Sequence, residues 1–199
     1  MTEETLLIPT DDYLKAGIHI GTKFKNKYMS SFIYKIRSDG LSVLNLKKID
    51  ERIGLAAKFL SQYSPDEIMI ASRRENGWKP VRMFAKSLGA MGYPGRYPPG
   101  ILTNPSLINF VEAKVLFVID PWPDRNAIID AKKIGIPVIA MCDTNNTPNM
   151  VDLVIPMNNK GKKALGLSLW LIAREYSKLR GLAKTDADFK FTAADFTPE

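Results

Sequence analysis

Two aspartates, Asp120 and Asp143, each follow directly after a run of apolar residues. Such unbroken runs are typical of buried parallel strands, whose carboxyl ends meet at one edge of a sheet. Two carboxylates at that edge could hold Mg²⁺ in a phosphoryl-transfer enzyme. Aspartate is also a preferred cap, because its carboxylate accepts hydrogen bonds from backbone amides. No lysine or serine at a suitable spacing completes a catalytic set. We therefore favour capping, and a nucleotide- or magnesium-binding enzyme that also uses the loop 144–147 is the alternative.

A basic stretch near the amino end is the strongest candidate for binding. Residues 23–37 hold five bases and no acid, and Phe24, Tyr28, Phe32 and Tyr34 are interleaved with them. Lysine and arginine can contact phosphates, while aromatic rings can stack on the unpaired bases of a nucleic acid. The alternative is that the rings are core and the cations are merely solvated, and some of these rings must pack. The five basic residues are Lys23, Lys25, Lys27, Lys35 and Arg37.

Further basic residues follow predicted strands or begin a predicted helix. Four of them come after the strand that ends at Ser72, namely Arg73, Arg74, Lys79 and Arg82. Arginines at a strand carboxyl end favour a polyanion over a small neutral substrate, and Arg96 and Arg125 could extend the same surface. Three lysines begin the last long helix, namely Lys160, Lys162 and Lys163. They oppose the helix dipole but could hold a phosphate together with the free amides, and a solvated helix start is an equal alternative.

The predicted nucleic-acid contacts can be stated as one set. They are Lys23, Lys25, Lys27, Lys35, Arg37, Arg73, Arg74, Lys79, Arg96, Lys160, Lys162 and Lys163.

The lone histidine and the lone cysteine are predicted to be structural. His19 lies among apolar residues without a nearby acid or nucleophile, and Cys142 ends an apolar strand. Because the chain has one residue of each kind, no internal disulfide and no ordinary zinc site can form, and we expect no cofactor and no metal.

The composition is that of a folded, basic protein. The 199 residues carry a formal net charge of +7, and 45% of them are hydrophobic, which suits one domain with a core. The positive charge is segregated along the chain, which favours a nucleic-acid partner over a uniformly solvated surface. No apolar run approaches the roughly 18 residues that span a bilayer, and the acidic amino terminus lacks the regions of a signal peptide. We therefore expect a cytoplasmic protein without a membrane partner.

The segment 114–180 contains the pattern that predicts the fold. A strand, a helix and a second strand in so short a span are typical of a βαβ unit. Together with earlier elements, this pattern predicts four or five parallel strands with helices on both faces, which is a three-layer α/β/α sandwich. Strands are expected at 68–71, 115–119, 137–142 and 153–155, and helices at 48–63, 76–88, 124–134 and 160–180.

The remaining segments flank this sandwich. We expect a helix at 10–15, a basic loop at 22–28, a hairpin of 31–37 and 41–46, a Gly- and Pro-rich excursion at 92–105 and a short helix at 107–111. Residues 1–182 should form a single domain, with 10–46 as the basic loop and hairpin extension and 47–182 as the sandwich. Residues 183–199 show no periodicity and are predicted to be a flexible tail that has no core to join.

Several long segments resemble a known family. They are 16–23, 32–37, 99–105, 120–121, 136–146, 151–156, 158–163 and 173–175. In residue type and order they are similar to the small-subunit ribosomal protein S-two family, in its archaeal branch, which is related to the eukaryotic SA protein. The resemblance covers about residues 10–181. Trp122 and the tail after Leu182 match no pattern of the family.

The resemblance implies a flavodoxin-like fold with no catalytic activity, no cofactor and no small-molecule substrate. Members of the family are structural constituents of the small ribosomal subunit, the ribonucleoprotein that acts in translation. They lie between its head and body and contact ribosomal RNA and neighbouring ribosomal proteins. The chain lacks the long helical arm that bacterial members insert after their first helix pair, which fits the archaeal branch.

Overall fold

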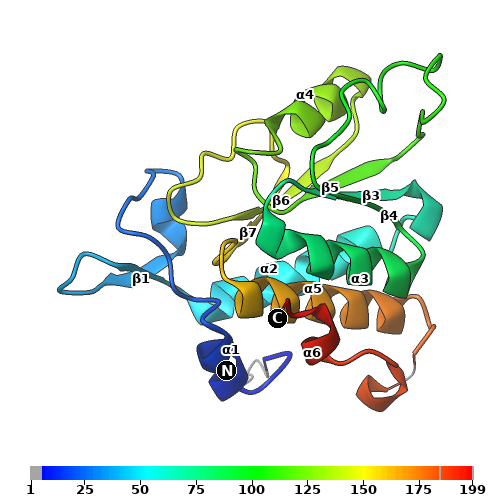
Figure 1. Ribbon diagram of the computed structural model, residues 1–199. Coiled ribbons are helices and arrows are strands. Elements are labelled where there is room, and N and C mark those ends of the chain that lie inside the picture. Colours follow the sequence, from blue (N-terminus) through cyan, green and yellow to red (C-terminus); the bar gives the residue numbers. More distant parts are fainter. Residues whose placement is uncertain (1–5, 184, 199) are drawn as a thin grey trace.

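Five parallel strands form the centre of the computed structural model, which describes residues 6–183 and 185–198 (Figure 1). In spatial order the strands are β4 (Met91–Pro94), β3 (Ile68–Ser72), β5 (Val115–Val118), β6 (Val138–Cys142) and β7 (Leu153–Pro156). Strands β3, β5 and β6 are buried along their whole length, as their unbroken apolar sequences predict for strands that are covered on both faces.

Helices cover both faces of this sheet (Figure 1). One face packs against α2 (Leu46–Leu60), α3 (Trp78–Leu88) and α5 (Lys162–Leu179), whose buried side chains share one core with inward-facing side chains of the strands. The other face is covered by α4 (Arg125–Ile134) and by the Gly- and Pro-rich segment 95–113. The predicted α/β/α sandwich with a flavodoxin-like parallel sheet is confirmed.

The direction in which the chain winds reverses between β3 and β5. From β3 the chain crosses through α3 to β4 at one edge, and from β5 it crosses through α4 to β6 on the other side. Right-handed crossovers in opposite directions place their helices on opposite faces of the sheet. At such a reversal the loops beyond the carboxyl ends of the two strands diverge, and open α/β sheets bind their ligands in the crevice between them.

The amphipathic sequence of α2 determines which face of this helix is buried. Asn45 caps its start, because the side chain accepts a hydrogen bond of 3.0 Å from the backbone nitrogen of Lys47. The next helix of this face, α3, ends at Gly89, whose φ of +80° is a conformation that glycine adopts at little cost. The spacing of five apolar residues at intervals of three and four predicts the inward face of this helix, and all five are fully buried, namely Ile49, Ile53, Ala56, Ala57 and Leu60.

A separate two-stranded sheet forms the extension near the amino end. Strand β1 (Ile33–Ile36) pairs antiparallel with β2 (Ser42–Leu44), which confirms the predicted hairpin. It projects from the side of the sandwich (Figure 1). Helix α1 (Thr10–Ala16) also forms where it was expected. Between α1 and the basic loop, Ile20 makes an isolated antiparallel bridge with Val43 of β2. This bridge joins the segment after α1 to the hairpin.

The prediction of a short helix at 107–111 is wrong. This segment consists of turns, in which the backbone nitrogen of Leu107 bonds to the oxygen of Asn104, and that of Phe110 to the oxygen of Leu107. A few residues cannot offset the cost of helix nucleation without an apolar face that packs. Ile108 is fully exposed and Val111 packs only partly against the core, so this segment lacks a continuous apolar face.

The prediction of a tail without a core to join is also wrong for the part of it that the structure describes. Residues 186–188 form a short 3₁₀ helix, and α6 (Ala193–Phe196) lies against α5 with Phe196 completely buried. The indole nitrogen of Trp170 donates a hydrogen bond of 2.8 Å to the backbone oxygen of Phe191. The physical reason is that α5 is apolar around most of its circumference, and such a helix needs a cover on its outer side.

Glycine at position 166 permits this close packing. A Cβ atom there would lie 2.5 Å from the hydroxyl of Thr197 and 3.0 Å from its Cα, so a larger residue would push the tail away from α5. Although α5 is rich in apolar residues, no helix among the described residues is long and apolar enough to cross a membrane.

Replacement of Phe196 by alanine tests the packing of the tail. The substitution removes a fully buried ring, and we expect it to lower the free energy of unfolding by about 3 kcal/mol, as measured by urea denaturation. The matched control is Leu182→Ala, because Leu182 is 68% exposed and its loss should change stability by less than about 0.5 kcal/mol. Equal effects of the two substitutions would contradict a contribution of the tail to the core.

Candidate nucleic-acid interface

The loops that follow four of the parallel strands meet at the carboxyl edge of the sheet. Asp120 follows β5 and lies opposite Arg74 from the loop after β3. Its carboxylate is fully buried, and both Nε and Nη2 of Arg74 lie 2.5 Å from Oδ2. The other oxygen accepts hydrogen bonds of 3.0 Å from the backbone nitrogen of Trp122 and from the amide of Asn146. Asp120 is therefore both a loop cap and one half of an ion pair.

Asp143, which follows β6, is satisfied in the same way. Its carboxylate accepts hydrogen bonds from the backbone nitrogen of Thr144 at 2.6 Å and from the ammonium of Lys160 at 2.9 Å. Asn146 joins this group to Asp120, because its side-chain oxygen accepts a hydrogen bond of 2.8 Å from the backbone nitrogen of Asp143 while its amide donates to Asp120. Among the described residues, no group of three or more His, Cys, Asp or Glu side chains could hold a metal ion.

A third carboxylate, Asp124, lies beneath the loop after β3. It is almost completely buried, and one of its oxygens accepts a hydrogen bond of 2.9 Å from the backbone nitrogen of Arg73. The other oxygen is buried without a hydrogen-bond partner. Removal from water disfavours the charged form and raises the pKa of Asp124 to about 7. The neighbouring charge of Asp120 raises this pKa further, and that of Arg74 lowers it.

The basic loop, residues 22–28, is fastened to the loop that follows β6. The backbone nitrogen of Thr22 donates to the hydroxyl of Thr144 at 2.9 Å, and the backbone nitrogen of Asn26 donates to the oxygen of Thr144 at 2.8 Å. A Cβ atom at Gly21 would lie 2.5 Å from the methyl group of Thr144, so this approach requires glycine. The buried side chain of Met29 fixes the far end of the loop in the core beneath α4.

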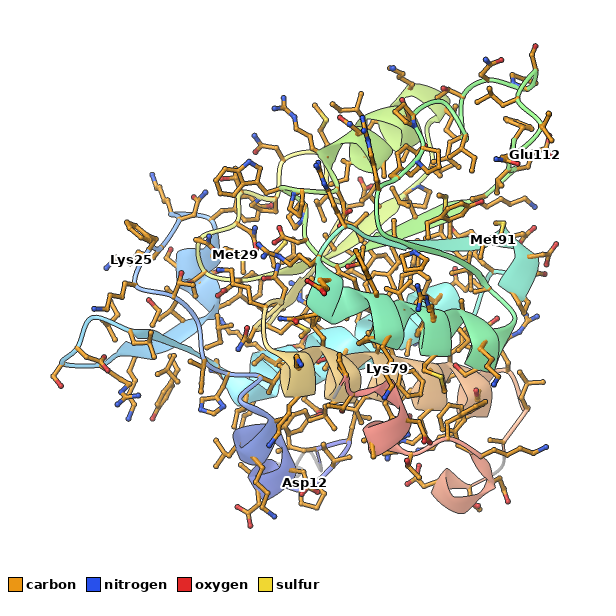
Figure 2. The ribbon with its side chains drawn as sticks, in the orientation of Figure 1. Asp12, Lys25, Met29, Lys79, Met91 and Glu112 are labelled. Carbon is orange, nitrogen blue, oxygen red and sulfur yellow. The ribbon has the colours of Figure 1, made fainter. Side chains whose placement is uncertain are left out.

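The cations and both rings of this loop face solvent. Lys23, Lys25 and Lys27 are exposed, and Phe24 and Tyr28 are 79% and 64% exposed. Figure 2 shows Lys25 at the outer side of the loop and Met29 turned towards the body of the protein. The two rings of the loop are therefore not core residues, unlike Phe32, which packs against both cores.

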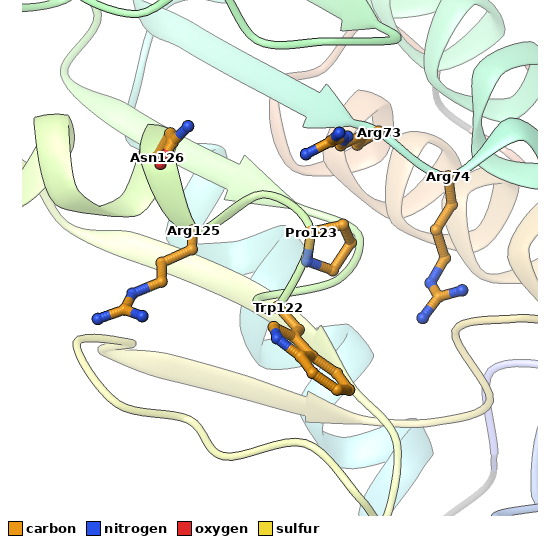
Figure 3. Close-up of a pocket in the computed structure, with 6 residues that line it drawn as sticks. All are labelled: Arg73, Arg74, Trp122, Pro123, Arg125 and Asn126. Atoms are coloured by element: carbon orange, nitrogen blue, oxygen red, sulfur yellow. The ribbon is translucent and has the colours of Figure 1, made fainter.

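Trp122 lies at the reversal of winding, in the loop after β5 and beside the loop after β3. Its side chain is 76% exposed. It borders a hollow of about 530 Å³, which is also lined by Arg73, Arg74 and Arg125 (Figure 3). It also borders a second hollow of about 410 Å³, on the side of the residue 145–150 loop.

The predicted contact residues fall into separate groups. Arg96 lies beside the loop after β3, because the preceding Gly95 donates a backbone hydrogen bond to the oxygen of Ser72. Lys79 and Lys163 line a different groove, between α1, α5 and α6. Lys35 and Arg37 lie on the projecting hairpin, where Arg37 pairs with Asp39 at 3.5 Å. Arg74 and Lys160 form ion pairs with buried carboxylates.

His19 and Cys142 have the environments of structural residues. The Nδ1 atom of His19 is buried without a hydrogen-bond partner, and burial lowers the pKa of its ring. Cys142 is fully buried, and burial raises the pKa of its thiol well above the usual range. A thiol that stays protonated is a poor nucleophile.

Comparison with known proteins identifies the family. A family model described as ribosomal protein S2 matches residues 13–112 and 111–178. Small ribosomal subunit protein uS2 of Picrophilus torridus is 47% identical over 196 residues, which cover 98% of both chains. The protein of the same name from Nanoarchaeum equitans is 46% identical, and the match covers 96% of this chain and 94% of that protein. The one from Pyrobaculum islandicum is 45% identical, and the match covers 98% of this chain and 97% of that protein. The chain belongs to the ribosomal protein S2 family.

Membership of the ribosomal protein S2 family confirms the resemblance seen in the sequence, including its archaeal character. The chain is thus a protein of the small ribosomal subunit, which acts in the cytoplasm, and not an enzyme. The alternative of a magnesium- or nucleotide-binding enzyme built on Asp120 and Asp143 is overturned. The geometry gives the physical reason, because nitrogen donors already occupy both carboxylates.

Sequence reasoning identified the two aspartates as caps but missed their basic partners. Arg74 and Lys160 were grouped with the other cations, although each lies within two to four residues after a strand and so near the edge where the carboxylates lie. The contact of Thr144 with Thr22 was also missed. Only the small residues Gly21 and Thr22, where the basic loop begins, could have indicated a close approach.

The two adjacent arginines allow a matched test of the buried ion pair. Arg74→Met would leave the buried carboxylate of Asp120 without its cation, and we expect the free energy of unfolding to fall by about 3 kcal/mol. The control is Arg73→Met, which removes an exposed side chain and should cost less than about 0.5 kcal/mol. Urea denaturation measures both. Adding Asp120→Asn to Arg74→Met should recover part of the loss, and no recovery would contradict this account.

Asp124 should make stability depend on pH. Its pKa is about 7 in the folded protein and 3.8 as the reference value, so folding favours the protonated form. The stabilising effect is complete below about pH 4 and is lost as the pH rises through 7. Asp124→Asn should remove this dependence. Between pH 4 and pH 8, the unfolding free energy of the variant should rise relative to wild type by on the order of 4 kcal/mol. Parallel stability–pH curves would show that Asp124 does not titrate in this way.

Proposed function

We propose that the chain is a non-catalytic structural constituent of the small subunit that binds ribosomal RNA with the carboxyl edge of its sheet. The observation that supports this most directly is the attachment of the basic loop to Thr144 and Thr147 in the loop after β6. This attachment brings exposed lysines from the amino end to the face that carries the arginines after β3. Positive charge from distant parts of the sequence thus lies on one face, as nucleic-acid binding requires.

The exposed aromatic rings favour RNA over a simple anion. Phe24 and Tyr28 lie among the lysines of the basic loop and face solvent. Phosphate binding needs only cations and amides, whereas exposed rings next to cations can stack on bases that are not paired. Single-stranded loops and bulges, which ribosomal RNA contains, present such bases.

The predicted contacts can be divided by the setting of each side chain. We propose direct phosphate contacts for the exposed cations Lys23, Lys25, Lys27, Arg73 and Arg96. Hairpin cations Lys35 and Arg37, and the helix-start cations Lys79, Lys162 and Lys163, would contact RNA on adjoining surfaces. Arg74 and Lys160 would act mainly by holding the loops in place, since each pairs with a buried carboxylate.

We further propose that the chain lies between the head and the body of the subunit and contacts neighbouring ribosomal proteins there. A partly apolar groove of about 670 Å³ between α1, α5 and α6 supports this, because it lies on the helical face opposite α4. Leu167 and Trp170 contribute to its lining. The apolar part of this groove is suited to a protein side chain, whereas Lys79 and Lys163, which also line it, can contact RNA beside that protein.

Charge reversal in the basic loop tests the RNA-binding proposal. The triple variant Lys23→Glu, Lys25→Glu and Lys27→Glu should weaken binding to small-subunit ribosomal RNA. Each lost phosphate contact should also reduce the slope of log affinity against log salt by about 0.7–0.9. Filter binding or fluorescence anisotropy over a series of salt concentrations measures both quantities.

The control must carry the same change in net charge on a different surface. Reversal of Lys58, Lys86 and Arg180 to glutamate satisfies this, because these exposed residues lie at the carboxyl ends of α2, α3 and α5, away from the carboxyl edge of the sheet. Its salt slope should stay close to that of wild type. Equal losses of affinity in the two variants would show that net charge alone matters, and unchanged affinity in the basic-loop variant would refute the assignment.

A further inference from the structure

Trp122 is a large apolar side chain in an unusual position. It is 76% exposed, although a tryptophan side chain of this size is normally buried over most of its surface. It lies directly beyond the carboxyl end of β5, at the point where the winding of the sheet reverses. This is the place where open α/β sheets bind ligands, and the carboxylates of Asp120 and Asp143 at this edge are already paired with Arg74 and Lys160.

The backbone holds this ring in a defined position. Pro121 and Pro123 flank it and restrict the chain on both sides. The backbone nitrogen of Trp122 donates a hydrogen bond of 3.0 Å to Asp120, whose carboxylate is itself fixed by Arg74. A tryptophan side chain has only two rotatable bonds, so a ring on a fixed backbone loses little conformational freedom when a ligand covers it.

The two sides of Trp122 differ in chemistry. The hollow of about 410 Å³ is lined by polar side chains such as Asn145, Thr147 and Asn149 and by the apolar Met150, which together suit the flat face and polar edge of a nucleobase. The hollow of about 530 Å³ is lined by Arg73, Arg74 and Arg125, which suit phosphates, and Arg125 also borders the smaller hollow. Both volumes lie in the range of about 300–1,000 Å³ that small-ligand sites have. In Figure 3 the Trp122 ring lies between the side chains of Arg74 and Arg125.

We propose that Trp122 is a stacking platform for one unpaired base of single-stranded RNA, and that Arg73 and Arg125 contact the phosphates beside that base. This inference rests on the proposed RNA binding and adds a site that distinguishes single-stranded from duplex RNA. A base within a duplex is stacked on both sides and cannot present its face, whereas a splayed base can. The lysines of the basic loop supply attraction to either form of RNA, and Trp122 adds a second preference for unpaired nucleotides to that proposed for Phe24 and Tyr28.

Binding of short RNA probes to Trp122 variants tests this. The probes are an unstructured oligouridylate and a duplex of equal length, both measured by fluorescence anisotropy. Trp122→Ala should weaken binding of the oligouridylate by about 5- to 150-fold, the range for loss of one stacked base. Its affinity for the duplex should change less than about twofold. Because no charge is removed, the salt slope should remain that of wild type.

Two further substitutions separate stacking from other contributions. Trp122→Phe keeps an aromatic face and should retain most of the affinity, whereas Trp122→Leu keeps apolar bulk without a stacking face and should behave like Trp122→Ala. Arg73→Met should lower the single-strand salt slope by about 0.7. Wild-type circular dichroism and an unchanged urea midpoint show that each variant is folded, as expected for an exposed side chain.

The outcomes distinguish this inference from the proposed function. If Trp122→Ala binds the oligouridylate as wild type does while the basic-loop variant loses affinity, the stacking site is refuted and RNA binding stands. If neither variant loses affinity, both proposals fail. If Trp122→Leu binds the oligouridylate more tightly than Trp122→Ala does, apolar bulk accounts for the affinity and the stacking site is refuted. If Trp122→Ala weakens only association with small-subunit proteins, the ring is a protein contact and the stacking site is likewise refuted.

Discussion

The buried carboxylate of Asp120 accepts hydrogen bonds from Arg74, Trp122 and Asn146, and so joins the loops after β3, β5 and β6. A charge in the interior is costly unless it is paired and its remaining lone pairs are bonded. That cost makes the arrangement of these loops strongly dependent on one another. Asn146 also accepts a hydrogen bond from the backbone nitrogen of Asp143, whose carboxylate pairs with Lys160. The next residue, Thr144, bonds to the basic loop.

This arrangement explains how a sheet edge that commonly holds ligands can serve a structural role. The positions that would bind a phosphate or a metal in a related fold are filled by internal ion pairs and amide bridges. What remains accessible is the outer rim, where Arg73, Arg96, Arg125 and the lysines of the basic loop face solvent. A large ligand such as RNA can contact the exposed cations of this rim, whereas a small substrate needs an enclosed site.

Most of the fold and part of the candidate site were predictable from local patterns. The apolar runs predicted the strands, and the spacing of Ile49, Ile53 and Leu60 predicted the buried face of α2. The turns at 107–111 and the packed tail were not predictable in the same way. Ile108 resembles a core residue until its surroundings are known, and Phe196 has a core to join only because α5 leaves an apolar side uncovered. Both depend on contacts between distant segments.

The sequence alone determined the family, the layer architecture and the segregation of positive charge, because these follow from residue order and from periodicity over neighbouring positions. Tertiary structure alone decided which cations are available. Arg73 and Arg74 are adjacent and chemically identical, yet one faces solvent and the other pairs with Asp120. That difference arises from a carboxylate 46 residues further along the chain. Likewise, only the folded chain brings Trp122 between the arginines and the asparagine-rich loop, since pairing and burial depend on distance in space.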